Sequence, residues 1–252
     1  MSIAAVFSLA IADEIKADAA NVKERPNVIV ILADDMGYGD TSNNGHPSIR
    51  TPHLDRMASE GQKWTNFYVP ASVCSPSRAG LLTGRLPVRS DVASLKHRVF
   101  FPWSKGGLPS AEMTLAEMFK AKGYQTAMFG KWHLGHLPEF LPTQQGFDTW
   151  FGIPYSNDMD RDRATTNALA KDDASGQFPA SYWYEPKSRY FNVPLMENDR
   201  LLERGPDQTL LTQEYTNRSL AFIRQNQQKL FFLYLAFNAA CTVVSLKGFL
   251  TP

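Results

Sequence analysis

One short segment brings together residue types that could do chemistry at a helix end, namely Cys74-Ser75-Pro76-Ser77-Arg78. Pro76 favours the first turn of a helix, and an apolar pair at 81–82 supplies a buried face further along. A helix amino terminus offers free N–H groups and positive potential, and Arg78 adds a full charge. The segment therefore predicts an anion site. Cys74 is then a low-pKa thiolate nucleophile, a neighbour of bound sulfate or phosphate, or an inert buried cysteine.

Two adjacent carboxylates, Asp34 and Asp35, follow a continuous run of apolar, largely β-branched residues at 28–32. Such a run is typical of a strand buried on both faces in a parallel sheet. Ligands of open α/β sheets bind beyond the carboxyl ends of the strands, so this position predicts a functional site. The alternative is a solvated turn that leads into Gly37 and Gly39.

A third polar group, Lys131 and His133, follows an expected strand at 124–129. Alternate residues of an extended segment lie on one face, so we expect both side chains to project together if the strand continues. A zinc site at His133 and His136 has little support, because no further cluster of ligands lies close to them in the sequence.

The elements that must position these residues alternate between helix and strand. Helices are expected from Thr51-Pro52 to Gly61, from the capping box at 114–117 to Gly123, and at 209–226. Strands are expected at 28–32, 63–69, 124–129 and 230–237. Residues 155–205, rich in Tyr, Asn, Asp and Pro, are expected to run over the surface. The alternation predicts an α/β layered fold without a second domain boundary.

Composition narrows the class of protein. The chain has 252 residues, 43% of them hydrophobic, which suits a globular protein with a sizeable core. Its 26 basic and 25 acidic residues give a net charge of +1, which argues against a nucleic-acid partner. Two cysteines cannot build a disulfide framework. No apolar run approaches the roughly 20 residues of a membrane span.

The amino terminus leaves two interpretations open. Residues 3–10 are apolar, and Ala10-Ile11-Ala12 fits the small-x-small rule for cleavage by signal peptidase. No Lys or Arg precedes them, so an alanine-rich disordered leader is the alternative. We assign 1–24 to this leader and 25–252 to the folded domain, and we expect export to the periplasm, the lysosome or the medium.

Four ordered motifs resemble those of the type I sulfatases, in the alkaline phosphatase superfamily. They are residues 27–40, 51–55, 74–85 and 130–135. Two further segments, 145–148 and 151–158, resemble the branch of arylsulfatase A and N-acetylgalactosamine-6-sulfatase, and the similarity covers residues 26 to about 238. The resemblance implies an alkaline phosphatase-like fold with a largely parallel central sheet flanked by helices.

The resemblance also implies a modified nucleophile. Cys74 would be oxidised to formylglycine by a maturation enzyme that recognises the Cys-x-Pro-x-Arg pattern. One hydroxyl of the aldehyde hydrate would attack sulfur and release the alcohol, and the second would expel sulfate. A serine could accept the sulfo group but could not make that second step. The implied substrates are sulfate esters of small molecules or glycans.

Roles for the other residues follow from the same resemblance. Calcium, or magnesium in its place, would be held by Asp34, Asp35 and the modified residue 74. Arg78 would stabilise the hydrate. Lys131 and Ser156 would contact the sulfate group, and His133 would form a hydrogen bond with the formylglycine.

The chain departs from the family pattern after 230–237. A catalytic histidine is expected there, but the sequence has Cys241 in its place and no histidine beyond His136. A metal-binding Asp-Asn pair and a second sulfate-binding lysine are also missing. We therefore expect the amino-terminal half of a sulfatase catalytic domain, truncated or frameshifted, with impaired activity. The alternatives are a phosphate or phosphonate ester hydrolase and a non-catalytic remnant.

Overall fold

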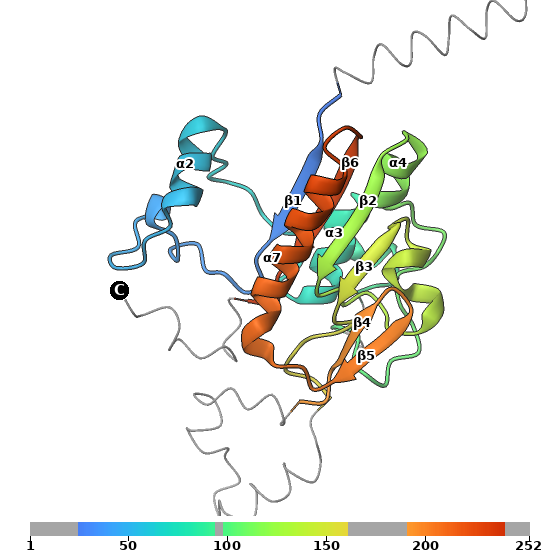
Figure 1. Ribbon diagram of the computed structural model, residues 1–252. Coiled ribbons are helices and arrows are strands. Elements are labelled where there is room, and N and C mark those ends of the chain that lie inside the picture. The colour runs from blue at the N-terminus through green and yellow to red at the C-terminus, as the bar shows by residue number, and fades with distance from the viewer. Residues whose placement is uncertain (1–24, 94–97, 161–190, 240–252) are drawn as a thin grey trace, which may run out of the picture.

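A six-stranded sheet forms the centre of the molecule in a computed structural model that describes residues 25–93, 98–160 and 191–239. The strands lie side by side in the order β1 (Val28–Leu32), β6 (Phe231–Ala236), β2 (Gln125–Gly130), β3 (Thr149–Gly152), β4 (Pro194–Glu197) and β5 (Arg200–Arg204) (Figure 1). The first four are parallel to one another, β4 pairs antiparallel with β3, and β5 pairs antiparallel with β4. The expected largely parallel α/β sheet is confirmed.

Helices cover both faces of this sheet. Helix α7 (Gln208–Gln225) crosses one face, and α3 (Cys74–Thr83) and α4 (Leu115–Ala121) lie on the other (Figure 1). Alternate residues of β2 and β6 point to opposite faces. Met128 and Tyr234 therefore pack in the core on the α3 side, whereas Phe129 and Leu235 pack against α7. Helix α2 (Pro52–Glu60) has no buried residue and stands apart from the sheet.

The helix ends agree with the sequence signals. Thr114 caps α4 in a capping box, accepting from the backbone N–H of Glu117 while the Glu117 carboxylate accepts from the backbone N–H of Thr114. Helix α3 begins at Cys74 itself and ends at Thr83, and the left-handed backbone of the following Gly84 lets its N–H reach the carbonyl of Gly80. The sequence predicts Cys74 just before a helix that starts at Pro76, and the helix in fact begins two residues earlier, so the position of Cys74 at the helix amino terminus is confirmed.

Strand β1 is less buried than its sequence indicates. Ile29 and Ile31 are 45% and 55% exposed, so burial on both faces is wrong for this strand. The reason is its place at the sheet edge: α7 packs against β2 and β6, and no described helix covers the face that carries these two isoleucines.

Two further expectations fail. Residues 63–69 form no strand, because the segment leaves the sheet with α2 and finds no ladder partner among the described residues, leaving Trp64 and Tyr68 exposed. The surface excursion expected at 155–205 instead contains the β4–β5 hairpin, and its residues 161–190 lie outside the described ranges. An Asn-Asp turn makes the hairpin, and Asn198 docks on the backbone of Trp150 at 2.8 Å.

Two glycines let the carboxyl ends of three strands approach each other. A Cβ at Gly130 would lie 1.8 Å from the carbonyl oxygen of Ala236, and one at Gly152 would lie 1.8 Å from that of Gly130. Gly130 also has a φ of +116°, which side-chain-bearing residues rarely adopt. Lys131 follows directly, so this close approach fixes where its side chain begins.

Gly130→Ala should destabilise the fold by roughly 3 kcal/mol or more, because overpacking and a positive φ add their costs. The measurement is urea unfolding followed by tryptophan fluorescence. Gly39→Ala is the matched control, since a Cβ there meets nothing within 4 Å. Equal midpoints for the two variants would show that the strand ends are not tightly packed.

No helix in the described ranges is long and apolar enough to cross a membrane. The leader assigned to 1–24 lies outside these ranges.

Candidate active site

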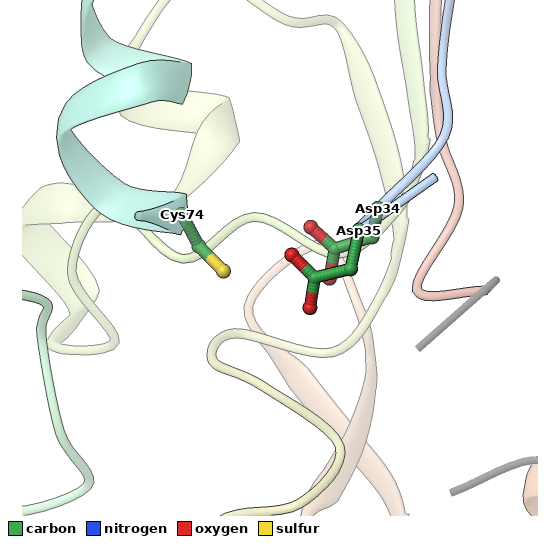
Figure 2. Close-up of side chains that lie close together, drawn as sticks. All are labelled: Asp34, Asp35 and Cys74. Atoms are coloured by element: carbon green, nitrogen blue, oxygen red, sulfur yellow. The ribbon is translucent and has the colours of Figure 1, made fainter. Parts of the chain in front are cut away.

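Three side chains predicted as metal ligands meet where β1 ends and α3 begins. Asp34, Asp35 and Cys74 each offer one ligand atom, and these atoms lie within 4.8 Å of one another. Figure 2 shows both carboxylates turned toward the Cys74 sulfur. Asp34 and Asp35 precede Cys74 by about forty positions in the sequence, and the fold brings the three side chains together. Their role as ligands stays a prediction.

Two buried cations share the Asp34 carboxylate. Arg78 donates from Nη2 to Oδ1 of Asp34 at 3.0 Å, and Lys131 donates from Nζ to Oδ2. The Arg78 and Lys131 side chains are each only 1% exposed, and Asp34 is 7% exposed. Charges removed from water in this way must be paired, so the three side chains constrain one another's positions.

The Lys131 ammonium is the hub of the site. Besides Asp34, it lies 3.3 Å from the Cys74 sulfur and 3.1 Å from the Ser156 hydroxyl oxygen. The ammonium of Lys131 therefore contacts a predicted metal ligand, Asp34, and a predicted sulfate-binding residue, Ser156. It also contacts Cys74, the cysteine expected to be modified. An anion that replaces any of these contacts would face a desolvated cation, where electrostatic attraction is strong.

The pKa values reflect this arrangement. Burial alone would raise the pKa of Asp34, but the charges of Arg78 and Lys131 and the hydrogen bonds they donate outweigh it and lower that pKa. Burial raises the pKa of the Cys74 thiol, and the nearby Asp34 charge adds to this, although Lys131 opposes both. The low-pKa thiolate considered for Cys74 is therefore not supported, and unmodified Cys74 is a poor nucleophile at neutral pH.

Backbone hydrogen bonds hold the three strand ends that carry these residues. The N–H of Phe237 donates to the carbonyl of Leu32, and the N–H of Lys131 donates to that of Ala236 at 2.8 Å. The N–H of Asp34 donates to the carbonyl of Ala239 at 3.0 Å. The loops after β1, β6 and β2 are thus joined directly, which places Asp34 beside Lys131.

His133 is buried and neutral. Burial, with the Lys131 and Arg78 charges, lowers its pKa well below the usual value. Its Nε2 lies 2.8 Å from the carbonyl oxygen of Phe100, which can only accept, so Nε2 carries the proton. Nδ1 is then an acceptor, and it is buried without a partner among the described residues.

The extended segment expected at Lys131 and His133 does not continue. Strand β2 ends at Gly130, and His133 has a φ of +59° in the left-handed region. The backbone turns because the N–H groups of Trp132 and His133 pair with the carbonyls of Ile153 and Pro154 instead of a strand partner. The condition for Lys131 and His133 to project to one strand face is therefore not met. The contact of His133 with modified residue 74 stays a prediction.

Two contributors escaped the sequence interpretation. The hydroxyl oxygen of Tyr234 lies 3.5 Å from Nη1 of Arg78, and the carbonyl of Lys131 accepts from the same nitrogen at 2.7 Å. The available signal was a single hydroxyl in the apolar run 231–236, since a buried tyrosine needs a polar partner. The Phe100 carbonyl had no such signal. Cys241, expected where the family has a histidine, lies outside the described residues.

Comparison with known families agrees with this geometry. The model of the family described as Sulfatase matches residues 26–240, most of the chain. The chain belongs to the sulfatase family. This sulfatase chain is 46% identical over 206 residues to arylsulfatase G of Rattus norvegicus, covering 80% of the chain and 38% of that protein. It is 55% identical over 140 residues to arylsulfatase A of Homo sapiens, covering 55% and 27%.

A third relative is N-acetylgalactosamine-6-sulfatase of Mus musculus, 39% identical over 227 residues, with 88% of this chain and 41% of the relative covered. The chain thus spans less than half the length of these curated relatives. The resemblance to the branch of arylsulfatase A and N-acetylgalactosamine-6-sulfatase is confirmed.

Solved structures give the same fold. The crystal structure of Ps i-CgsB matches with a TM-score of 0.65 and 29% identity, covering 86% of this sulfatase chain and 46% of that one. The structure of BT4656 in complex with its substrate, D-glucosamine-2-N,6-O-disulfate, matches with a TM-score of 0.58 and 25% identity, covering 86% and 35%. The alkaline phosphatase-like fold class is therefore confirmed.

Asp34→Asn should cost about 3–5 kcal/mol of stability, because it leaves the Lys131 and Arg78 charges buried without their carboxylate. Asp35→Asn is the matched control and should change stability by less than about 0.5 kcal/mol, since Asp35 is exposed and Asn tolerates its left-handed backbone. Urea unfolding measures both. Similar losses in the two variants would contradict a buried charge network.

Stability should depend on pH through His133. Its folded pKa is depressed, so the unfolded chain takes up a proton first as pH falls. The stabilisation present above about pH 6.5 should decline below it by up to about 1.4 kcal/mol per pH unit. His133→Gln should flatten this part of the stability curve relative to the unsubstituted chain. Parallel curves for the two proteins between pH 5 and about 7 would show that His133 is not buried and neutral.

Proposed function

We propose that this chain contributes the nucleophile-bearing part of an enzyme that hydrolyses sulfate esters. The single observation that supports this is the Lys131 ammonium, which touches the carboxylate of Asp34, the sulfur of Cys74 and the hydroxyl of Ser156. Lys131 and Ser156 would bind sulfate oxygens beside residue 74, and Asp34 would hold the Lys131 ammonium in place. Membership of the sulfatase family supports this reaction class, and substrates would be sulfated small molecules or glycans.

We infer that Cys74 acts after conversion to formylglycine by a maturation enzyme. The raised pKa of the thiol argues against direct attack by sulfur, and the Cys-x-Pro-x-Arg pattern is present at residues 74–78. When present, the aldehyde hydrate supplies two hydroxyls on one carbon, so that attack on sulfur and later release of sulfate can use different oxygens. The position of Cys74 in the first turn of α3 would place that hydrate at the positive end of the helix.

The residues present fit a hard divalent cation. Asp34 and Asp35 supply carboxylate oxygens beside residue 74, and conversion of the thiol would leave oxygen as the only donor type. Calcium prefers about six to eight oxygen ligands, and magnesium about six. Asp34, Asp35 and residue 74 would hold the ion, which would lower the pKa of the attacking hydroxyl and draw in a sulfate oxygen.

The chain's own side chains would do the remaining work. Lys131 and Ser156 would orient the sulfate group, because their polar atoms lie 3.1 Å apart beside residue 74. Arg78 would hold Asp34 and stabilise charge at the nucleophile. The unprotonated Nδ1 of His133 would accept a hydrogen bond from a hydroxyl on residue 74.

The apolar residues 3–10 and the small-x-small pattern after them support a further proposal, that the protein is exported.

Coexpression with a formylglycine-generating enzyme should convert Cys74 to the aldehyde, seen by mass spectrometry of the peptide that contains residue 74. The converted chain should then release sulfate from 4-nitrophenyl sulfate, and Cys74→Ala should not. Lys131→Ala should lower the rate by about 100-fold or more, as expected for loss of a charged group at the reacting centre. Lys120→Ala is the matched control, because Lys120 pairs with Asp148 away from the site.

Unmodified Cys74 in a host that matures other sulfatases would contradict the proposal. So would faster turnover of 4-nitrophenyl phosphate than of the sulfate, because that result would assign the site to phosphate esters.

A further inference from the structure

One edge of the central sheet is apolar and open. Strand β1 lies at the end of the strand order and pairs only with β6 among the described residues (Figure 1). Its sequence, Val-Ile-Val-Ile-Leu, contains no charged or polar side chain. The opposite edge strand, β5, is exposed along its length and carries Arg200, Glu203 and Arg204. Charges protect an edge strand from pairing with further strands, whereas an apolar edge such as β1 favours it.

The open backbone groups of β1 belong to Ile29 and Ile31. The carbonyl of Leu32 accepts from the N–H of Phe237, which continues β6, at 2.9 Å. Backbone groups of successive strand residues point alternately to the two sides of the strand. The N–H and carbonyl groups of Ile29 and Ile31 therefore point away from β6, and no described strand pairs with them. Their side chains are exposed as well, so an added strand would satisfy both the backbone and the apolar surface.

The described structure ends beside this edge. The N–H of Asp34 donates to the carbonyl of Ala239, the last described residue, at 3.0 Å. Residues 240–252 therefore continue from the carboxyl end of β1. A strand outside β1 would lie two strand spacings, about 10 Å, from β6. The five steps from Ala239 to Val244 span up to about 17 Å when extended, so the chain can cross the end of β1 and reach its open edge.

The sequence after this point has the composition of a strand. Residues 242–246 read Thr-Val-Val-Ser-Leu, rich in the β-branched residues that strands favour. Alternate residues of a strand lie on one face, so Val244 and Leu246 would share a face and Ser245 would lie on the other. A segment that runs back from the carboxyl end of β1 is antiparallel to it. Its apolar face would then meet the exposed isoleucines of β1.

We propose that residues 242–246 add to the open edge of β1 as an antiparallel strand, with Val244 opposite Ile31 and Leu246 opposite Ile29. The unpaired backbone groups of the two isoleucines would gain partners, and the four side chains would pack side by side on one face of the sheet. The added strand would stabilise β1, and with it the loop that carries the two carboxylates of the site. It would form whether or not the chain hydrolyses sulfate esters.

Residue-resolved hydrogen exchange of the full chain tests this strand. The amides of Ile29 and Ile31 should exchange at least about 100-fold more slowly than in an unfolded chain, because both would donate to the added strand. Val244→Asp should speed their exchange by about tenfold or more, since a charge would replace an apolar, β-branched side chain beside Ile31. Thr251→Asp, which adds the same charge outside the strand, is the matched control and should leave the exchange within about twofold.

The amide of Val30 points to β6 and separates local opening of the edge from global unfolding. It should stay protected in every variant, and a cross-link decides if Val244→Asp exposes it as well. Ile31→Cys with Val244→Cys, in a chain that also has Cys241→Ser, should form an intramolecular disulfide, because opposed residues of antiparallel strands lie within disulfide range. Ile31→Cys with Thr251→Cys in the same background is the control and should form none.

Rapid exchange of Ile29 and Ile31 in a chain whose Val30 amide is protected would overturn the proposal. Exchange that Val244→Asp leaves unchanged, or a pair at 31 and 244 that does not cross-link, would also overturn it. Protection that is lost on dilution, together with a dimer in sedimentation, would assign the edge to a second copy of the chain and would equally contradict the added strand.

Discussion

The arrangement of this site depends on two buried cations that share one buried carboxylate. Lys131 and Arg78 are almost fully removed from water, and Asp34 is the buried acidic group that pairs with both in the described structure. The excess of positive charge is costly unless a further anion compensates it. Because two buried cations share only one carboxylate, a bound oxyanion next to Ser156 and residue 74 would be favoured.

The order of the strands in the sheet brings those charges together. Asp34 follows β1, Lys131 follows β2, and the end of β6 between them accepts the hydrogen bond that positions Lys131. Gly130 allows the strand ends to come close enough for this contact. Helix α3 adds Cys74 at its first turn and Arg78 one turn later, so a single helix supplies both the proposed nucleophile precursor and a buried cation. Local backbone geometry thus decides the electrostatics of the site.

Local patterns in the sequence predicted β1, β2, β6 and α7, because apolar runs and helical periodicity depend on neighbouring residues. Predictions from these local patterns were wrong where the structure of a segment depends on which other strands and helices it packs against. Residues 63–69 have strand-like composition but no ladder partner in the described structure. Strand β1 is less buried than predicted because it lies at the edge of the sheet. Motifs predicted the site residues, yet the Asp34–Arg78 ion pair joins residues 44 positions apart. The role of Tyr234 and the turn at His133 depend on packing that no local pattern records.

The most direct measurement of the central claim uses Cys74→Ser, in which the substituted hydroxyl can accept a sulfo group but cannot expel it. The chain would be incubated with a ³⁵S-labelled aryl sulfate, and the peptide containing position 74 would be analysed by mass spectrometry and counting. Sulfur transfer to that peptide, absent in Cys74→Ala, is the predicted result. An unlabelled peptide under conditions in which the ester binds would contradict a sulfotransfer site at residue 74.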